Sequence, residues 1–345
     1  MSRCCARHVI GAVLAVVLLA ASAGAQDIHV TQYDLAPIHL NPALAGQFRG
    51  DVRLNAVFRN QWASVPAPFN TFAVGADAVV MRADRTDSRL GAGLFLHNDV
   101  AGDSKFTTLS VMVPVGYTFH LTKEAVDVRF GVGIQAGVLH KSLQTDALFY
   151  DNQFNGEAFD PGLGGESAID RLNATVPDLG AGFHLSATVL DRWGIDLGYA
   201  TTHLIPVEQT FLSGTVDLVL QRRNSFYTSL SHRFEGWRID GRYLYKEQGP
   251  KREHVFGSTV TVYPEAWRRR QGSWMVGAFG RWNDAVIGRV GMTMSGWTLG
   301  LAYDVNVSDL RTASNTYGAI EVATIYTWGV PRPDRTKYKR RCSVF

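Results

Sequence analysis

The chain has 345 residues, 46% of them hydrophobic and 11% aromatic, with 34 glycines and 12 prolines. A mean hydropathy of -0.04 excludes a helical membrane protein, but it suits a membrane barrel whose apolar residues are diluted by a polar lumen. The formal net charge of +3 argues against a general nucleic-acid-binding protein, so nucleic acid is not an expected partner.

The N-terminal 25 residues have the layout of a secretory signal peptide. Arg3 and Arg7 precede an apolar run over residues 9–21, and Ala23-Gly24-Ala25 forms a small-residue cleavage site. We therefore expect export and a mature chain that begins near residue 26. Two of the three cysteines would leave with this segment, so Cys342 would have no intrachain disulfide partner.

An irregular segment, residues 26–49, comes next and contains Pro37 and the turn signal Asn41-Pro42. From residue 50 to residue 329, apolar and polar side chains alternate with few interruptions, which predicts about fourteen strands. We place these strands at residues 50–60, 70–82, 89–98, 105–119, 125–141, 178–189, 192–201, 224–235, 236–246, 252–263, 272–282, 284–294, 296–306 and 317–329.

The clearest alternation runs from Val126 to His140, where one face is apolar and the other carries Asp127, Arg129 and glycines. This length is close to the ~9 to 11 residues that a tilted strand needs to cross a bilayer. A long strand of a soluble sandwich would explain this stretch alone, but not its repetition or the aromatic residues at the ends of apolar faces, such as Trp237 and Tyr245. The pattern predicts an all-β, transmembrane antiparallel barrel in the outer membrane of a Gram-negative bacterium.

Connection lengths give a second test of the barrel, because outer-membrane barrels alternate short periplasmic turns with longer external loops. The long connections 142–177 and 202–223 both follow odd-numbered strands, whereas 190–191 follows an even-numbered strand. This places both termini in the periplasm. The tail, residues 330–345, would therefore be periplasmic, and its basic residues Lys337, Lys339, Arg340 and Arg341 would dock an acidic or peptidoglycan-associated partner.

Side chains that could carry chemistry are few. The sequence contains no HExxH, GxSxG, Walker or CxxC motif, so no catalysis, cofactor or small-molecule substrate is expected. Asp146, Asp151, Asp160 and Asp170 could collect a calcium ion, but they lack the regular spacing of a calcium loop. Charged residues predicted to face the lumen are of both signs, which favours paired networks over ion selectivity. They are Asp127, Arg129, Arg238, Asp240, Arg242, Arg281 and Arg289.

The irregular segment and the end of the first predicted strand carry motifs typical of one family. These motif residues are Gln32, Tyr33, Asn41, Pro42, Ala43, Gly46, Arg59, Asn60, Gln61, Trp62 and Pro68. They resemble the opening of the PorP/SprF family of type IX secretion membrane proteins of Bacteroidetes, in which Phe58 here replaces the usual Tyr.

This resemblance implies a non-catalytic outer-membrane accessory of type IX secretion. Its partners would be secretion components and a secreted surface protein such as a large adhesin, with outer-membrane lipid around the barrel. The motif residues would either seal the start of the barrel or bind a partner, and both readings stay open. A porin-like solute channel is the alternative function, and it requires a lumen that neither loops nor residues 26–49 plug.

Overall fold

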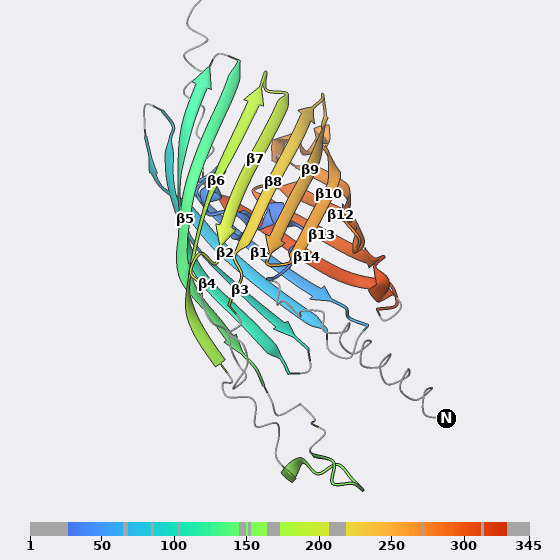
Figure 1. Cartoon of the computed structure of the whole chain (residues 1–345). Helices are drawn as coiled ribbons and strands as arrows, with labels where there is room; N and C mark the ends of the chain where they lie inside the picture. The colour runs from blue at the N-terminus through green and yellow to red at the C-terminus, as the bar shows by residue number, and fades with distance from the viewer. Residues whose placement is uncertain are drawn as a thin grey trace, which may run out of the picture.

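The computed structural model describes residues 27–329 except 65–67, 84–85, 103, 124, 145–149, 151–152, 164–172, 207–218, 271 and 312–313. The chain forms a closed antiparallel barrel of fourteen strands, in which sequence neighbours pair and β1 pairs with β14 (Figure 1). The strands are β1 (Val52–Gln61), β2 (Phe69–Arg82), β3 (Arg89–Ala101), β4 (Phe106–Lys123), β5 (Val126–Ser142), β6 (Asn173–Val189), β7 (Trp193–Thr202), β8 (Arg223–Arg233), β9 (Trp237–Gln248), β10 (Lys251–Val262), β11 (Ser273–Arg281), β12 (Ala285–Met294), β13 (Trp297–Asn306) and β14 (Tyr317–Trp328).

The described helices are short: η1 (Tyr33–Leu35), α2 (Pro37–Leu40), η2 (Pro42–Leu44), η4 (Pro161–Leu163), η5 (Glu265–Arg270) and η6 (Asp309–Arg311). No helix among the described residues has both the length and the apolar character needed to cross a membrane.

Side chains sort between the two faces of the wall as the alternation predicts. On β5, Phe130 and Ile134 are exposed on the outer face, whereas Gly133 and Gln135 are buried on the inner face. The predicted fold class, a transmembrane-type antiparallel barrel of fourteen strands, is confirmed.

One strand boundary differs clearly from the prediction. β6 begins at Asn173 rather than at residue 178, because Pro177 is accommodated inside the strand, paired with Val138 of β5. Proline lacks an N–H group and is tolerated where that group would face away from the neighbouring strand. The error came from treating Pro177 as the end of a loop.

The barrel has two mouths, distinguished by the connections around them. We call the mouth with residues 143–172 and 203–222 the long-connection mouth, and the mouth with residues 83–88 and 190–192 the short-turn mouth. β1 begins and β14 ends at the short-turn mouth, where Val52 pairs with Trp328. Asp27, the first described residue, lies at the long-connection mouth, where its backbone N–H donates to Gln248 Oε1 at 2.9 Å.

Candidate functional site

Residues 27–49, which we call the plug, run through the lumen from the long-connection mouth to the short-turn mouth (Figure 1). The plug touches every strand of the barrel. The wall residues that it contacts are, from β1 to β14, Arg53, Asp77, Arg89, Gly116, Gly133, Phe183, Tyr199, Tyr227, Arg242, Glu253, Arg281, Arg289, Asp304 and Glu321.

Apolar residues of the plug pack against small apolar clusters on the inner wall. Ile28, Val30 and Leu35 contact a cluster that includes Val57 and Ala323. Because the surrounding lumen is polar, these clusters fix the path of the plug but leave its backbone groups and the nearby charges to be satisfied separately.

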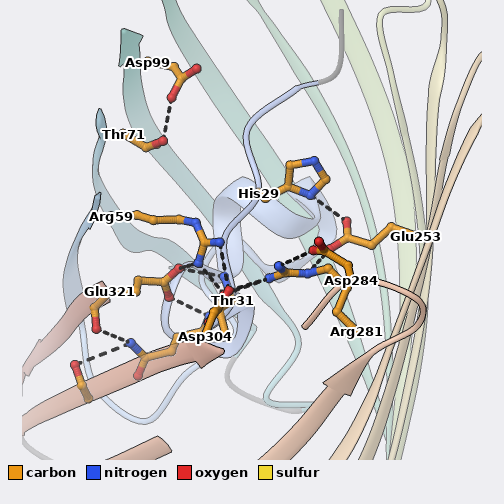
Figure 2. A network of polar contacts seen from close by, with 12 residues as sticks. His29, Thr31, Arg59, Thr71, Asp99, Glu253, Arg281, Asp284, Asp304 and Glu321 are labelled. Atoms are coloured by element: carbon orange, nitrogen blue, oxygen red, sulfur yellow. Dashed lines mark hydrogen bonds and ion pairs between the residues drawn. The ribbon is translucent and has the colours of Figure 1, made fainter. Parts of the chain in front are cut away.

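The first part of the plug is held by a buried charged network centred on Thr31, shown in Figure 2. The Arg59 guanidinium donates to Thr31 Oγ1 at 2.6 Å and to Asp304 at 2.9 Å, and it lies 3.4 Å from Glu321. Arg281 donates to Thr31 Oγ1 at 3.0 Å and to Asp304 at 3.1 Å. The backbone N–H of Thr31 donates to Glu321 at 2.7 Å, so one residue of the plug joins four strands, β1, β11, β13 and β14.

The network is almost completely removed from water. The exposed fractions of the side chains are 2% for Arg59, 1% for Asp304 and 0% for Glu321. Removing one member of a buried ion pair leaves an unpaired charge in a poorly solvated site and typically costs about 3–5 kcal/mol. The plug and wall therefore depend on each other at this point.

A second charged group fixes the plug at the long-connection mouth. Asp27 lies 2.7 Å from His203, which follows β7, and 2.8 Å from Arg223. His203 also lies 3.0 Å from Asp178. Burial disfavours the charged forms of both Asp27 and His203, but their opposite charges outweigh it. His203 and Arg223 hold the pKa of Asp27 well below its usual range, and Asp27 and Asp178 raise the pKa of His203 to about 9.

Asp34 ties the plug to β9 and β12. Its carboxylate accepts two hydrogen bonds from Arg289, at 2.7 and 3.0 Å, and lies 2.6 Å from Arg242. Both arginines stand at inward positions of their strands, β12 and β9. Bidentate pairing of this kind fixes the orientation as well as the charge of the partner.

Asn41 organises the turn in the middle of the plug. Its side-chain oxygen accepts from the Ala43 N–H at 2.9 Å, which caps η2, where Pro42 occupies the first helical position. The Asn41 amide donates to the backbone oxygens of Phe183 at 2.9 Å and Tyr199 at 3.2 Å. The motif Asn-Pro therefore shapes the plug and fastens it to β6 and β7.

Beyond Asn41 the plug also lies in close contact with the backbone of the wall, and charged side chains hold only its last turn. A Cβ atom on Gly133 of β5 would lie 2.7 Å from the Ala43 Cα atom, and one on Gly91 of β3 would overlap the Ala45 carbonyl group. Only glycine leaves room for this contact. Further inward glycines, Gly116 and Gly131, also face the plug.

The last turn of the plug is fixed by Gly46, whose φ of +73° favours glycine. Its N–H donates to Asp77 at 2.8 Å. The Arg53 guanidinium donates to both oxygens of Asp77 at 2.9 Å and to the Leu44 carbonyl at 3.0 Å. This group of contacts ends the plug at the short-turn mouth.

The structure divides the predicted site residues into two sets. Those brought together at the plug are Gln32, Tyr33, Asn41, Pro42, Ala43, Gly46, Arg59, Arg242, Arg281 and Arg289. Those outside the plug contacts are Asn60, Gln61, Trp62 and Pro68 near the long-connection mouth, and Asp127, Arg129, Arg238 and Asp240, which pair locally on the wall. The tail residues Lys337, Lys339, Arg340 and Arg341 lie outside the described residues.

Sequence reasoning missed several acidic partners in the networks and the role of the wall glycines. Asp77, Asp304 and Thr31 were not selected, although Asp77 and Asp304 occupy inward positions in alternating strands. Of the acidic residues considered for calcium, only Asp160 is described, and its Oδ1 accepts from the Gly162 N–H at 2.8 Å. Within the described ranges, no cluster of three or more His, Cys, Asp or Glu residues is arranged to hold a metal.

Comparisons with known proteins agree with this architecture. A family model described as "Type IX secretion system membrane protein PorP/SprF" matches residues 22–326. No curated protein matches the chain. The toluene transporter TbuX of Ralstonia pickettii is similar in structure, with a TM-score of 0.51 and 14% identity over 84% of this chain and 92% of that one. The toluene transporter TodX of Pseudomonas putida gives 0.49 and 12%, over 88% and 95%. The likeness to TbuX concerns the barrel fold alone.

Proposed function

Because the chain belongs to the PorP/SprF family of type IX secretion system membrane proteins, we propose that it is a non-catalytic outer-membrane accessory of that system. It would support secretion or surface attachment of one or a few partner proteins, such as a large adhesin, or link to the periplasmic machine. The family is one of secretion-system membrane proteins and not a known enzyme family.

The observation that carries this proposal is the plug. A solute channel needs a continuous aqueous path, but residues 27–49 contact all fourteen strands, and the network around Thr31 is nearly water-free. Selectivity rings are built from charges of one sign, whereas here each inward arginine of the plug site has an acidic partner. The plugged lumen favours the accessory function over the porin-like alternative.

The lengths of the connections support an orientation of the barrel in the outer membrane. We propose that residues 1–25 are a cleaved export signal and that the long-connection mouth faces the cell exterior. The start of the mature chain, which was expected in the periplasm, would then lie at the exterior mouth, because the plug runs back through the lumen from Asp27. The tail after β14 would then lie in the periplasm, where its basic residues would dock an acidic or peptidoglycan-associated component. Replacing Lys337, Lys339, Arg340 and Arg341 with Gln should weaken co-purification of such a component in a salt-dependent way.

The decisive experiment is deletion of the gene, with surface proteins and small-solute uptake measured in the same cells. We expect one or a few large surface proteins to be lost while small-solute permeability is unchanged, and expression of the wild-type chain should restore them. A deletion strain with reduced solute uptake and a normal set of surface proteins would support the porin-like channel instead.

Purified wild-type protein in planar bilayers gives an independent measure of the lumen. We expect little steady conductance, since the plug would remain in place. A large and persistent conductance would contradict a closed lumen.

A further inference from the structure

The outer face of the barrel is hollowed near the long-connection mouth, over β8, β9 and β10, which lie side by side in the wall (Figure 1). The hollow has a volume of about 450 Å³, within the range of about 300–1,000 Å³ usual for sites that bind small groups. Cross-strand partners share a face, so the exposed Phe226 places its row on the outside, away from the plug. The residues that line the hollow are Phe226, Tyr243, Tyr245, Arg252 and His254.

The hollow lies where the outer face changes from apolar to polar. Toward the short-turn mouth, the next outward side chains include Leu230 and Ile239, which are apolar and exposed. Toward the long-connection mouth, Asn224, Glu247 and Arg252 form one cross-strand row. The end of the apolar belt marks the depth of the lipid headgroups, where aromatic side chains gather. A group bound in the hollow would therefore lie at the level of the headgroups.

The polar side chains of the hollow are held in fixed positions. The Tyr243 hydroxyl and His254 Nδ1 are hydrogen-bonded at 2.9 Å, and the centroids of the Tyr245 and His254 rings are 4.9 Å apart. A surface that is already ordered binds a ligand at a lower cost in conformational entropy. The hollow therefore offers a preformed surface of flat rings with polar edges, which suits a headgroup better than a disordered acyl chain.

The rim of the hollow is positively charged, since Arg222, Lys251 and Arg252 are exposed there. Arg222 lies beside the β9–β10 turn, where Gln248 donates to the carbonyl of the preceding residue at 3.2 Å. Among the described outward-facing residues of β8, β9 and β10, Glu247 is the one acidic side chain. It lies 3.7 Å from Arg252, and the two side chains are 33% and 67% exposed, so the pair contributes little. Arg252 is therefore available to an anion.

We propose that the hollow binds the phosphorylated headgroup of an outer-leaflet lipid, with Arg252 contacting the phosphate. This inference goes beyond the accessory function and rests on the orientation proposed above, in which the long-connection mouth faces the exterior. Arginine holds phosphate through charge-assisted hydrogen bonds. Arg222 and Lys251 add positive charge, and the rings of Phe226 and Tyr245 pack against the less polar part of the headgroup.

The position of the hollow favours a lipid over a soluble anion or a protein. On its short-turn side the hollow is continuous with the exposed apolar side chains of β8 and β9, such as Leu230 and Ile239, which lipid tails surround. A lipid can occupy the charged rim with its headgroup and the apolar surface with its acyl chains. A soluble anion would use only the charged rim.

Arg252→Gln tests the proposal in the full-length mature protein, purified in detergent and titrated with lipid A, a phosphorylated glycolipid. Native mass spectrometry measures the fraction that carries one lipid. We expect the Kd to rise about five-fold or more, as for one lost charge-assisted hydrogen bond. Arg192→Gln is the matched control, because it removes an exposed arginine at the opposite mouth and should leave the Kd unchanged. Heat-modifiable migration on a gel checks that both variants fold.

Glu247→Gln gives a test of opposite sign, since it removes the acidic side chain beside Arg252 and should bind lipid A at least as tightly as the wild type. Lipid A without its phosphates should bind more weakly, and inorganic phosphate should not displace intact lipid A. Equal affinity of the wild type and Arg252→Gln would overturn the proposal. Equal binding of lipid A with and without phosphates would overturn it too, because the contact would then be purely apolar.

A photo-crosslinking amino acid at position 228, beside Tyr243 on the outer face, identifies the occupant in cells. We expect a crosslink to a phosphorylated glycolipid. A crosslink to a protein would overturn the proposal, and a crosslink to phospholipid alone would overturn the assignment to the outer leaflet. These outcomes are distinct from the test of the accessory function, which fails only if gene deletion leaves the surface proteins complete.

Discussion

The two ends of the plug are held mainly by different kinds of contact. Residues 27–34 are held mainly by long charged side chains such as Arg59 and Arg281, which reach inward from the wall. Residues 41–47 lie directly on the wall, where Gly91 and Gly133 allow close contact. A lumen can therefore hold a segment either by charge pairing across a distance or by backbone contact without side chains.

The difference predicts different responses to mutation. A charged network is stable only when complete, because each missing partner leaves a desolvated charge. A glycine contact contains no charge that a mutation could leave unpaired, but it tolerates no added atom. Substitutions at the two ends should therefore differ in how much stability they remove and in which contacts of the plug they break.

The largest effect is expected for Arg59→Ala. This change leaves Glu321 without a cationic partner and Asp304 with Arg281 alone, and it should destabilise the folded protein by about 3–5 kcal/mol. Thermal unfolding in detergent, followed by circular dichroism, measures the loss, and proteolysis near the N-terminus should increase. Arg129→Gln is the control, because its side chain is partly exposed and lies outside the plug contacts. A small effect of Arg59→Ala would show that water screens the network.

A smaller effect is expected at the glycine end. Gly133→Ala places a methyl group against the Ala43 backbone and should cost about 1–3 kcal/mol through overpacking. Gly288→Ala serves as the control, since a Cβ atom there meets nothing within 4 Å. We expect planar-bilayer conductance to rise in Gly133→Ala but not in Gly288→Ala. If the two variants behave alike, close approach does not position the plug.

Asn41→Ala connects the two ends and should act on both. It leaves the Phe183 and Tyr199 carbonyls without their amide donor and should cost about 1–2 kcal/mol. Combining it with Gly133→Ala tests coupling, because neighbouring sites in one contact are expected to be non-additive. Strict additivity would mean that the turn and the glycine contact are independent.

The smallest effect is a pH dependence at the long-connection mouth. The pKa of His203 is raised to about 9 from an ordinary value of 6.5, so its stabilisation is complete below pH 6.5 and is lost as the pH rises through about 9. The melting temperature should therefore fall between pH 7 and pH 10, and it should fall less in His203→Gln. A pH profile of the melting temperature identical to that of the wild type would show that His203 does not cause the effect.

Much of the fold could be predicted from sequence, because every strand has one face toward lipid and one toward the polar lumen, and this sets the period-two alternation. Arg242, Arg281 and Arg289 were identified as inward charges on that basis. Their partners in the plug could not be predicted, since Thr31 and Asp34 lie in an irregular segment with no periodicity to show which strands they face. The glycines were visible as inward residues, but an inward glycine is equally compatible with an open pore until the plug is placed against it.

Arg59 and Glu321 have one further property, since they are cross-strand partners on β1 and β14, the first and last strands. This pair sits on the seam where the sheet closes on itself. The backbone of Thr31 and Gln32 bonds to Glu321 from inside the same seam. The plug must therefore be enclosed before or while β1 and β14 pair. Entry after the barrel has closed would require a folded segment to pass through its lumen. The plug thus takes part in closing the barrel, because it binds at the pairing of β1 with β14.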